Sequence, residues 1–409
     1  MGERSIEGNI WRYKVFSAFA HTPLFISVVV LFFTANGLDM FDVFLLQSIF
    51  AVAVVVLEVP TGMVADRLGK RRSIIWAMNT QVAGWVAYGL GDGFWPFLGA
   101  EVLLALGAAL YSGAHTALLY DSLVALDRRD EYRRLQGEAH SVQLVSFAFF
   151  TLIGGIVGHF SLRATVWASM LGPIVALCIA LGFVEVRRVE LPTSIGESLR
   201  GYRTLLGAAL RFVFKHRLVR WYILLMSVTS GALMWVLWLY QPYMEAGGLP
   251  VWFFGVAFAL FNLVAAFSSR KADAFVKWVG EDRSVLVLMG LIIAPLFLMA
   301  GFVGPLAFML IFGHQLARGM LGPVISDRIL RYTFADKRAT VLSLMSMSAK
   351  LFFAVTAPVI GYIAVEDDLS LTFLSEGAFM VVVYAALWFI YRRVPRKYFK
   401  VKADVEAQV

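Results

Sequence analysis

Cysteine and charge are both scarce in this sequence. Among 409 residues there is one cysteine, Cys178, so an internal disulfide is excluded and no cysteine pair can hold a metal. Charged residues make up 16% of the chain, whereas a soluble domain holds about a quarter. No nucleotide-binding Gly-x-x-x-x-Gly-Lys-Ser/Thr loop and no His-Glu-x-x-His motif is present. We therefore expect neither an ATP-driven motor nor an enzyme, and no cofactor or metal.

Apolar residues are abundant instead. They make up 60% of the chain, and its mean hydropathy is +0.75, which predicts an all-α integral membrane protein embedded in a lipid bilayer. A membrane-spanning helix needs about 20 apolar residues. Twelve segments qualify as transmembrane helices: 15–33, 41–65, 73–91, 94–123, 139–160, 164–184, 218–243, 251–268, 284–301, 305–330, 339–365 and 371–391.

The connecting loops alternate in charge. One set is rich in lysine and arginine, as in "DRLGKRR" and "DRRDEYRR", while the other is short and poor in them, as in "TANGLDM" and "GDG". The protein is predicted to lie in the cell membrane. Because basic loops stay in the cytoplasm, both of its termini are predicted to be cytoplasmic. The net charge of +8 then reflects topology, and no nucleic-acid partner is expected.

The chain divides into two halves that resemble each other. Residues 1–184 and 218–392 each hold six expected spans, separated by a linker at 185–217 and followed by a tail at 393–409. The linker could be an amphipathic helix on the inner leaflet or a solvated connection. "SGAHTALLYDSL" aligns with "RGMLGPVISDRI", which matches Gly113 to Gly319 and Asp121 to Asp327. Such internal repeats build the central binding site of many transporters.

The stretch "GMVADRLGKRR" follows the second expected span. It resembles the signature loop of the major facilitator superfamily, whose pattern is met by Gly62, Val64, Ala65, Asp66, Arg67, Gly69, Lys70 and Arg71. The resemblance implies two six-helix bundles that rock about a central substrate site. It also suggests the drug-efflux branch without identifying a substrate.

The same resemblance implies a gating latch. Gly62 would allow close helix packing, and Gly69 would permit a tight turn. Asp66 would accept hydrogen bonds from the start of the span that begins near Ala339. Lys70 or Arg71 would pair with Asp121.

Ionisable residues inside spans are the candidates for substrate and proton binding, since they are costly there. In the fourth span, Glu101 and His115 share a helix face with Ser112. Glu101 stands at the position where another motif of the same family, on this span, has an arginine. Two interpretations are open: Glu101 is a proton or cation site, or it is a glutamate near the outer membrane interface. Further candidates in the second half are Trp235, Trp238, Gln241, His314, Arg318 and Lys350. The two cations among them either meet a substrate anion or form internal pairs.

Two functions follow from these candidates. The first is proton-coupled efflux of small amphipathic compounds, with Glu101 as proton site and the tryptophans lining the pocket. The second is transport of an anionic solute, such as an organic acid, a phosphorylated metabolite or a siderophore, bound by Arg318 and Lys350. A receptor or lipid-moving protein on the same fold is a third class. In each case we expect a monomer.

Overall fold

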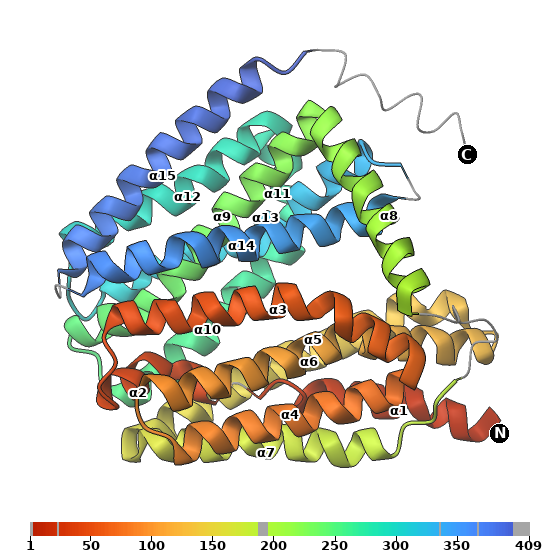
Figure 1. Ribbon diagram of the computed structural model, residues 1–409. Helices are drawn as coiled ribbons and strands as arrows, with labels where there is room; N and C mark the ends of the chain where they lie inside the picture. The colour runs from red at the N-terminus through yellow and green to blue at the C-terminus, as the bar shows by residue number, and fades with distance from the viewer. Residues whose placement is uncertain (1–2, 23, 187–194, 335–336, 366–367, 396–409) are drawn as a thin grey trace. The chain divides into compact units, whose positions relative to one another are not determined.

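Helices make up almost all of the computed structural model, which describes residues 3–22, 24–186, 195–334, 337–365 and 368–395 (Figure 1). Within these ranges there is no strand. The helices are α1 (Glu3–Phe19), η1 (Phe25–Ser27), α2 (Val29–Ala35), α3 (Met40–Leu68), α4 (Lys70–Leu90), α5 (Phe94–Ala125), η2 (Arg129–Glu131), α6 (Tyr132–Phe160), α7 (Leu162–Leu181), α8 (Ile195–Lys215), α9 (Arg217–Ala246), α10 (Val251–Arg270), α11 (Ala272–Val279), α12 (Glu281–Gly301), η3 (Ala307–Leu310), α13 (Ile311–Arg331), α14 (Arg338–Ala364) and α15 (Leu369–Arg392).

The predicted all-α membrane fold is confirmed. Ten of the described helices are long and apolar enough to cross a bilayer. Two expected spans fall outside these ten. One is α4, which carries the polar run Asn79–Thr80–Gln81 in its middle. The other is the segment from α1 to α2, which is not one continuous helix. With these two, the element order matches a twelve-span fold.

The first expected span, 15–33, is interrupted. α1 ends at Phe19, and helical structure returns only with η1 and α2. The sequence places Pro23 in this interval, and proline cannot donate the hydrogen bond that a continuous helix needs. Inside a membrane the freed backbone groups must find other partners. Ser169 of α7 supplies one, because its Oγ accepts the N–H of Phe25 at 3.0 Å.

The chain forms two compact units. Unit 1 comprises Met1–Ile195 with Leu249–Leu260, and unit 2 comprises Gly196–Gly248 with Phe261–Val409. The first turns of α10 therefore group with unit 1. In unit 1, α5 packs against α3 and α4, while α7 packs against the other side of α4. In unit 2, α9 packs against α13, α14 and α15, and α12 packs against α13 and α15.

The linker between the two expected halves contains a helix. α8 runs from Ile195 to Lys215, and His216 ends it by capping α9: the imidazole Nδ1 accepts the N–H of Val219 at 3.3 Å. Residues 187–194 of the linker and the tail from 396 onward lie outside the described residues.

Candidate functional site

A polar cavity of about 470 Å³ opens within unit 1. Three helices build it, α1, α5 and α6. The lining residues are Tyr13, Ser17, Tyr111, Ser112, His115, Thr116, Gln136, Gly137, Ala139, His140 and Gln143. His115 is the one residue of this cavity that the sequence prediction named as a site residue. We call this cavity the unit 1 pocket.

Three stacked rings form one wall of the unit 1 pocket. His115 lies between Tyr13 and Tyr111, with ring centroids 4.0 Å and 4.8 Å apart and nearly parallel planes. Ser17 Oγ lies 3.3 Å from His115 Nε2. Helical spacing explains the arrangement, since Tyr111 and His115 are four residues apart on α5, as are Tyr13 and Ser17 on α1. In the sequence, the four-residue spacing of Tyr111 and His115 was the available signal for this stack of rings.

Among the described residues, the lining of the unit 1 pocket contains no lysine, arginine, aspartate or glutamate. The nearest charged neighbours along the chain, Lys14 and Glu138, pair with each other across α1 and α6. The wall therefore offers flat aromatic faces together with hydroxyl, amide and imidazole groups. Such a wall suits a molecule with an apolar ring or chain and several hydrogen-bonding groups.

Glu101 lies elsewhere in unit 1. Its side chain is buried on α5, and Oε1 accepts two hydrogen bonds of 2.6 Å, from Gln47 Nε2 of α3 and from the hydroxyl of Tyr88 of α4. Tyr88 in turn packs against the ring of Phe97 at 5.2 Å. Glu101 is therefore held by three helices and does not belong to the pocket lining.

The candidates of unit 2 form two groups. On α13, His314 Nε2 lies 3.1 Å from the carbonyl of Ile292, and Arg318 Nη2 donates to Asn262 Oδ1 at 2.7 Å. Arg318 is exposed, and within the described residues it has no ion pair with a carboxylate. Lys350 is half-buried on α14.

The second group lies on α9. Trp235 is buried, and its Nε1 donates to Thr356 Oγ1 at 3.1 Å. Trp238 and Gln241 are buried as well. These three side chains belong to the interior of unit 2.

Glu376 of α15 is a buried carboxylate that the sequence analysis did not select. It is fully inaccessible, and among the described residues neither of its oxygens has a hydrogen-bond partner. The sequence signal for it was a single glutamate within an apolar span.

The signature loop forms a compact network in unit 1. Lys70 makes an ion pair with Asp121, whose side chain is only 2% exposed. Arg71 instead donates to the carbonyl of Leu181 at 2.8 Å. Of the two cations expected opposite Asp121, Lys70 is thus the partner.

A carboxylate that was not anticipated completes this network. Glu185 accepts the backbone N–H groups of Lys70 at 2.9 Å and of Arg71 at 2.7 Å. These are among the first amides of α4, which have no partner inside the helix. The negative charge also suits the positive end of the helix dipole. Gly69 precedes them with a φ of +96°, so the expected turn is present.

Two members of the expected latch remain separate from this network. Gly62 is exposed, and a Cβ added to it would meet no atom within 4 Å, so no helix packs closely on it within unit 1. Asp66 is exposed at the end of α3. Its expected partner near Ala339 belongs to unit 2, so that pairing stays a prediction.

The all-helical fold with ten described helices of membrane-spanning length is that of a multi-span membrane protein. The model of the Major Facilitator Superfamily matches residues 15–331, and the chain belongs to this family.

Two curated relatives are similar in sequence. The lysophospholipid transporter LplT of Photorhabdus laumondii is 24% identical over 219 residues, which are 54% of this chain and 52% of that protein. The match thus spans about half the length of LplT. The uncharacterized MFS-type transporter YxaM of Bacillus subtilis is 20% identical over 404 residues, 94% of this chain and 96% of that protein.

Solved transporter structures share the fold at low identity. A mutant of the nucleoside transporter NupG has a TM-score of 0.80 at 12% identity, covering 94% of this chain and 100% of that one. A bacterial homologue of the lysosomal transporter Spinster has a TM-score of 0.73 at 15% identity, covering 96% and 98%. The D-xylose–proton symporter has a TM-score of 0.67 at 14% identity, covering 96% and 97%.

Proposed function

We propose that this transporter exports small amphipathic compounds in exchange for protons. The observation that carries the proposal is the uncharged unit 1 pocket with its Tyr13–His115–Tyr111 stack. Three rings give an apolar ring or chain a flat contact surface, while the surrounding hydroxyl and amide groups take its polar part. The half-length similarity to a transporter named for lysophospholipids, which are amphiphiles, is consistent with this substrate class.

Glu101 is the proposed proton carrier. Both of its described partners, Gln47 and Tyr88, are neutral hydrogen-bond donors. Neither is a cation that would keep the carboxylate ionised, so the group can take up a proton. Proton loading and release would then accompany alternating access by the rocker-switch motion. We further propose that the protein acts as a monomer in the cell membrane with cytoplasmic termini, as its basic loops suggest.

Transport in proteoliposomes under an imposed pH gradient tests the coupling. With a lipophilic dye cation as substrate, Glu101→Gln should lose pH-driven movement but keep dye binding, because glutamine still accepts both hydrogen bonds without carrying a proton. Glu376→Gln is the matched control, since it neutralises a fully buried carboxylate of unit 2. Unchanged coupling in Glu101→Gln, or equal loss in both variants, would remove Glu101 from its role.

Binding to the unit 1 pocket is tested separately. Aromatic stacking contributes about 0.5–1.5 kcal/mol per pair, so Tyr13→Leu and His115→Leu should each weaken dye binding roughly two- to tenfold. Tyr362→Leu removes a ring that is 73% exposed and lies outside the pocket, and it should leave affinity unchanged. If all three variants bind alike, the pocket is not the substrate site.

An anionic solute is the second candidate substrate. It is favoured by Arg318, an exposed guanidinium whose described partner is the neutral amide of Asn262. In that case, thermal-shift titrations with organic acids and sugar phosphates should show stabilisation that Arg318→Gln or Lys350→Gln removes. Stabilisation by anions but not by dye cations would replace the first proposal with this one.

A further inference from the structure

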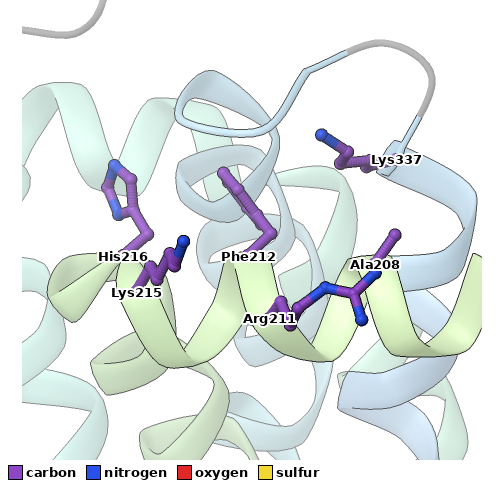
Figure 2. A pocket seen from close by; sticks show the side chains of 6 residues that line it. All are labelled: Ala208, Arg211, Phe212, Lys215, His216 and Lys337. Carbon is purple, nitrogen blue, oxygen red and sulfur yellow. The ribbon is translucent and has the colours of Figure 1, made fainter.

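A basic pocket lies at the junction of α8 and α9 in unit 2. Its volume is about 520 Å³, and its lining consists of Ala208, Arg211, Phe212, Lys215, His216 and Lys337. Figure 2 shows four of these side chains projecting from the end of α8, with Lys337 reaching in from the start of α14. Three lining residues are cations, and among the described residues none of the lining is acidic.

The sequence of α8 explains this concentration of charge. Arg211, Phe212, Lys215 and His216 follow Ala208 at spacings of three, four, seven and eight, which places them on one helix face. From residue 198 to residue 220 the chain has six lysine and arginine residues and no aspartate or glutamate. This part of the chain therefore concentrates positive charge along and around the pocket face of α8.

Aromatic rings fix the position of Lys337 beside the pocket. Its ammonium lies 5.8 Å from the centre of the Phe212 ring and 5.2 Å from that of Phe334. His216 stacks obliquely on Phe212 at 5.6 Å. Burial lowers the pKa of the His216 imidazole, so this ring is neutral at pH 7 and the positive charge comes from the other three side chains.

Exposed apolar side chains lie beside the cations of the basic pocket on α8, where Phe214 follows Arg211 by three residues. Leu210 and Phe214, one helical turn apart on α8, are 36% and 65% exposed. A second cavity of about 180 Å³ is lined by Leu206, Ala339, Thr340, Ser343, Leu344 and Met347. Both cavities are lined by side chains of the same two segments, α8 and the start of α14, and this second one is largely apolar. A cationic pocket beside exposed aliphatic and aromatic side chains is the surface that an amphiphilic anion would cover.

We infer that the basic pocket binds the phosphate of an anionic phospholipid from the leaflet next to α8, with the acyl chains along Leu210 and Phe214. Arg211, Lys215 and Lys337 would contact the phosphate oxygens, since charge-assisted hydrogen bonds to phosphate are strong. A soluble phosphate ester offers the same phosphate chemistry without the chains. The apolar border favours the lipid. The inference is independent of the substrate proposed above.

Native mass spectrometry of the full chain in neutral detergent tests this inference, with phosphatidylglycerol as the probe and phosphatidylcholine as the neutral comparison. A basic residue near an anionic lipid surface strengthens binding roughly fivefold. Arg211→Gln/Lys215→Gln should therefore weaken phosphatidylglycerol binding roughly 25-fold, and Lys337→Gln roughly fivefold. Arg217→Gln/Arg283→Gln is the matched control, since it removes two exposed charges of unit 2 that do not line the pocket.

Each result decides the matter. Preferential binding of phosphatidylglycerol that the pocket variants lose and the control keeps supports the inference. Equal weakening by both double variants would show diffuse attraction to positive charge and overturn it. Competition by glycerol 3-phosphate or inorganic phosphate at the concentration of the lipid would assign the pocket to a soluble phosphate and overturn the lipid source. If the pocket double variant fails to fold, the single Lys337→Gln variant gives the same test.

Discussion

Gly69→Ala should be among the most destabilising single-methyl additions in unit 1. Gly69 has a φ of +96°, which L-residues with a Cβ avoid. An added Cβ would also lie 2.7 Å from Oε2 and 2.8 Å from Cδ of Glu185. That carboxylate is the group that accepts the first two amides of α4. The methyl group would therefore strain the turn and displace the cap together.

Two contributions add up to the expected loss. The backbone of Gly69, with φ +96° and ψ +148°, lies in a region that residues with a Cβ rarely adopt, at a cost of about 1–2 kcal/mol. The carboxylate is flexible and can move aside, but two half-exposed charge-assisted hydrogen bonds would then be lost, worth together about 1–3 kcal/mol. The free energy of unfolding should fall by about 2–5 kcal/mol in total. At about 3 °C per kcal/mol for a unit of this size, the melting temperature should drop by roughly 6–15 °C.

Fluorescence-detected melting of the purified protein in detergent measures this drop. Gly62→Ala is the matched control on the preceding helix. It has open space at its Cβ position and should be neutral or stabilising by up to about 1 kcal/mol, because alanine favours a helix over glycine. In a Glu185→Ala background the penalty of Gly69→Ala should shrink to the backbone strain alone, about 1–2 kcal/mol.

The reasoning would be refuted by equal melting temperatures for Gly69→Ala and Gly62→Ala. It would be refuted in part if the Gly69→Ala penalty were the same with and without Glu185. In that case the strained turn acts alone, and the carboxylate is not part of the effect.

Three further predictions concern buried partners. Glu101→Leu should lower the melting temperature more than Glu101→Gln. Leucine leaves the buried donors of Gln47 and Tyr88 without an acceptor, at a cost of about 1–3 kcal/mol each. Equal melting temperatures of the two variants would contradict the hydrogen bonds described. Gly172→Ala should destabilise unit 1, since its Cβ would lie 1.9 Å from Thr22 Oγ1 and 2.7 Å from Thr22 Cβ. Thr22→Ala in the same chain should restore part of the loss, because it removes the hydroxyl contact but keeps the Cβ. Lys70→Gln should remove the ammonium that pairs with the buried Asp121 carboxylate and cost up to about 3–5 kcal/mol. Adding Asp121→Asn should recover part of this loss, and a double variant less stable than the single one would argue against the ion pair.

Much of the fold could be predicted from the sequence alone. A segment inside the bilayer must be helical, because an unpaired backbone group in lipid is too costly. Runs of apolar residues mark such segments, and these runs are visible in the sequence without coordinates. The signature loop was equally visible, since Gly69, Lys70 and Arg71 lie within three consecutive positions. Family membership followed from those residues and is confirmed by the match over residues 15–331.

The break in the first span was only partly visible. Pro23 marks the interval in the sequence, but proline is tolerated within membrane helices wherever neighbours satisfy the freed groups. α3 shows this, since it continues through Pro60. In the first span the helix ends, and the N–H of Phe25 after the interruption finds its partner in Ser169 of α7, which is 144 residues away and is not visible as a partner in the sequence.

The sites depended most on the tertiary structure. Charge in a span identified Glu101 and Arg318 as candidates, but it could not show that Glu101 is held by Gln47 and Tyr88. Nor could it reveal that Glu185 reaches back 115 residues to cap α4. The described lining of the unit 1 pocket holds no lysine, arginine, aspartate or glutamate, so the cost of burying charge pointed to His115 alone among its residues. Contacts between distant helices depend on how side chains pack in three dimensions, and a linear pattern of hydropathy and charge does not contain that information.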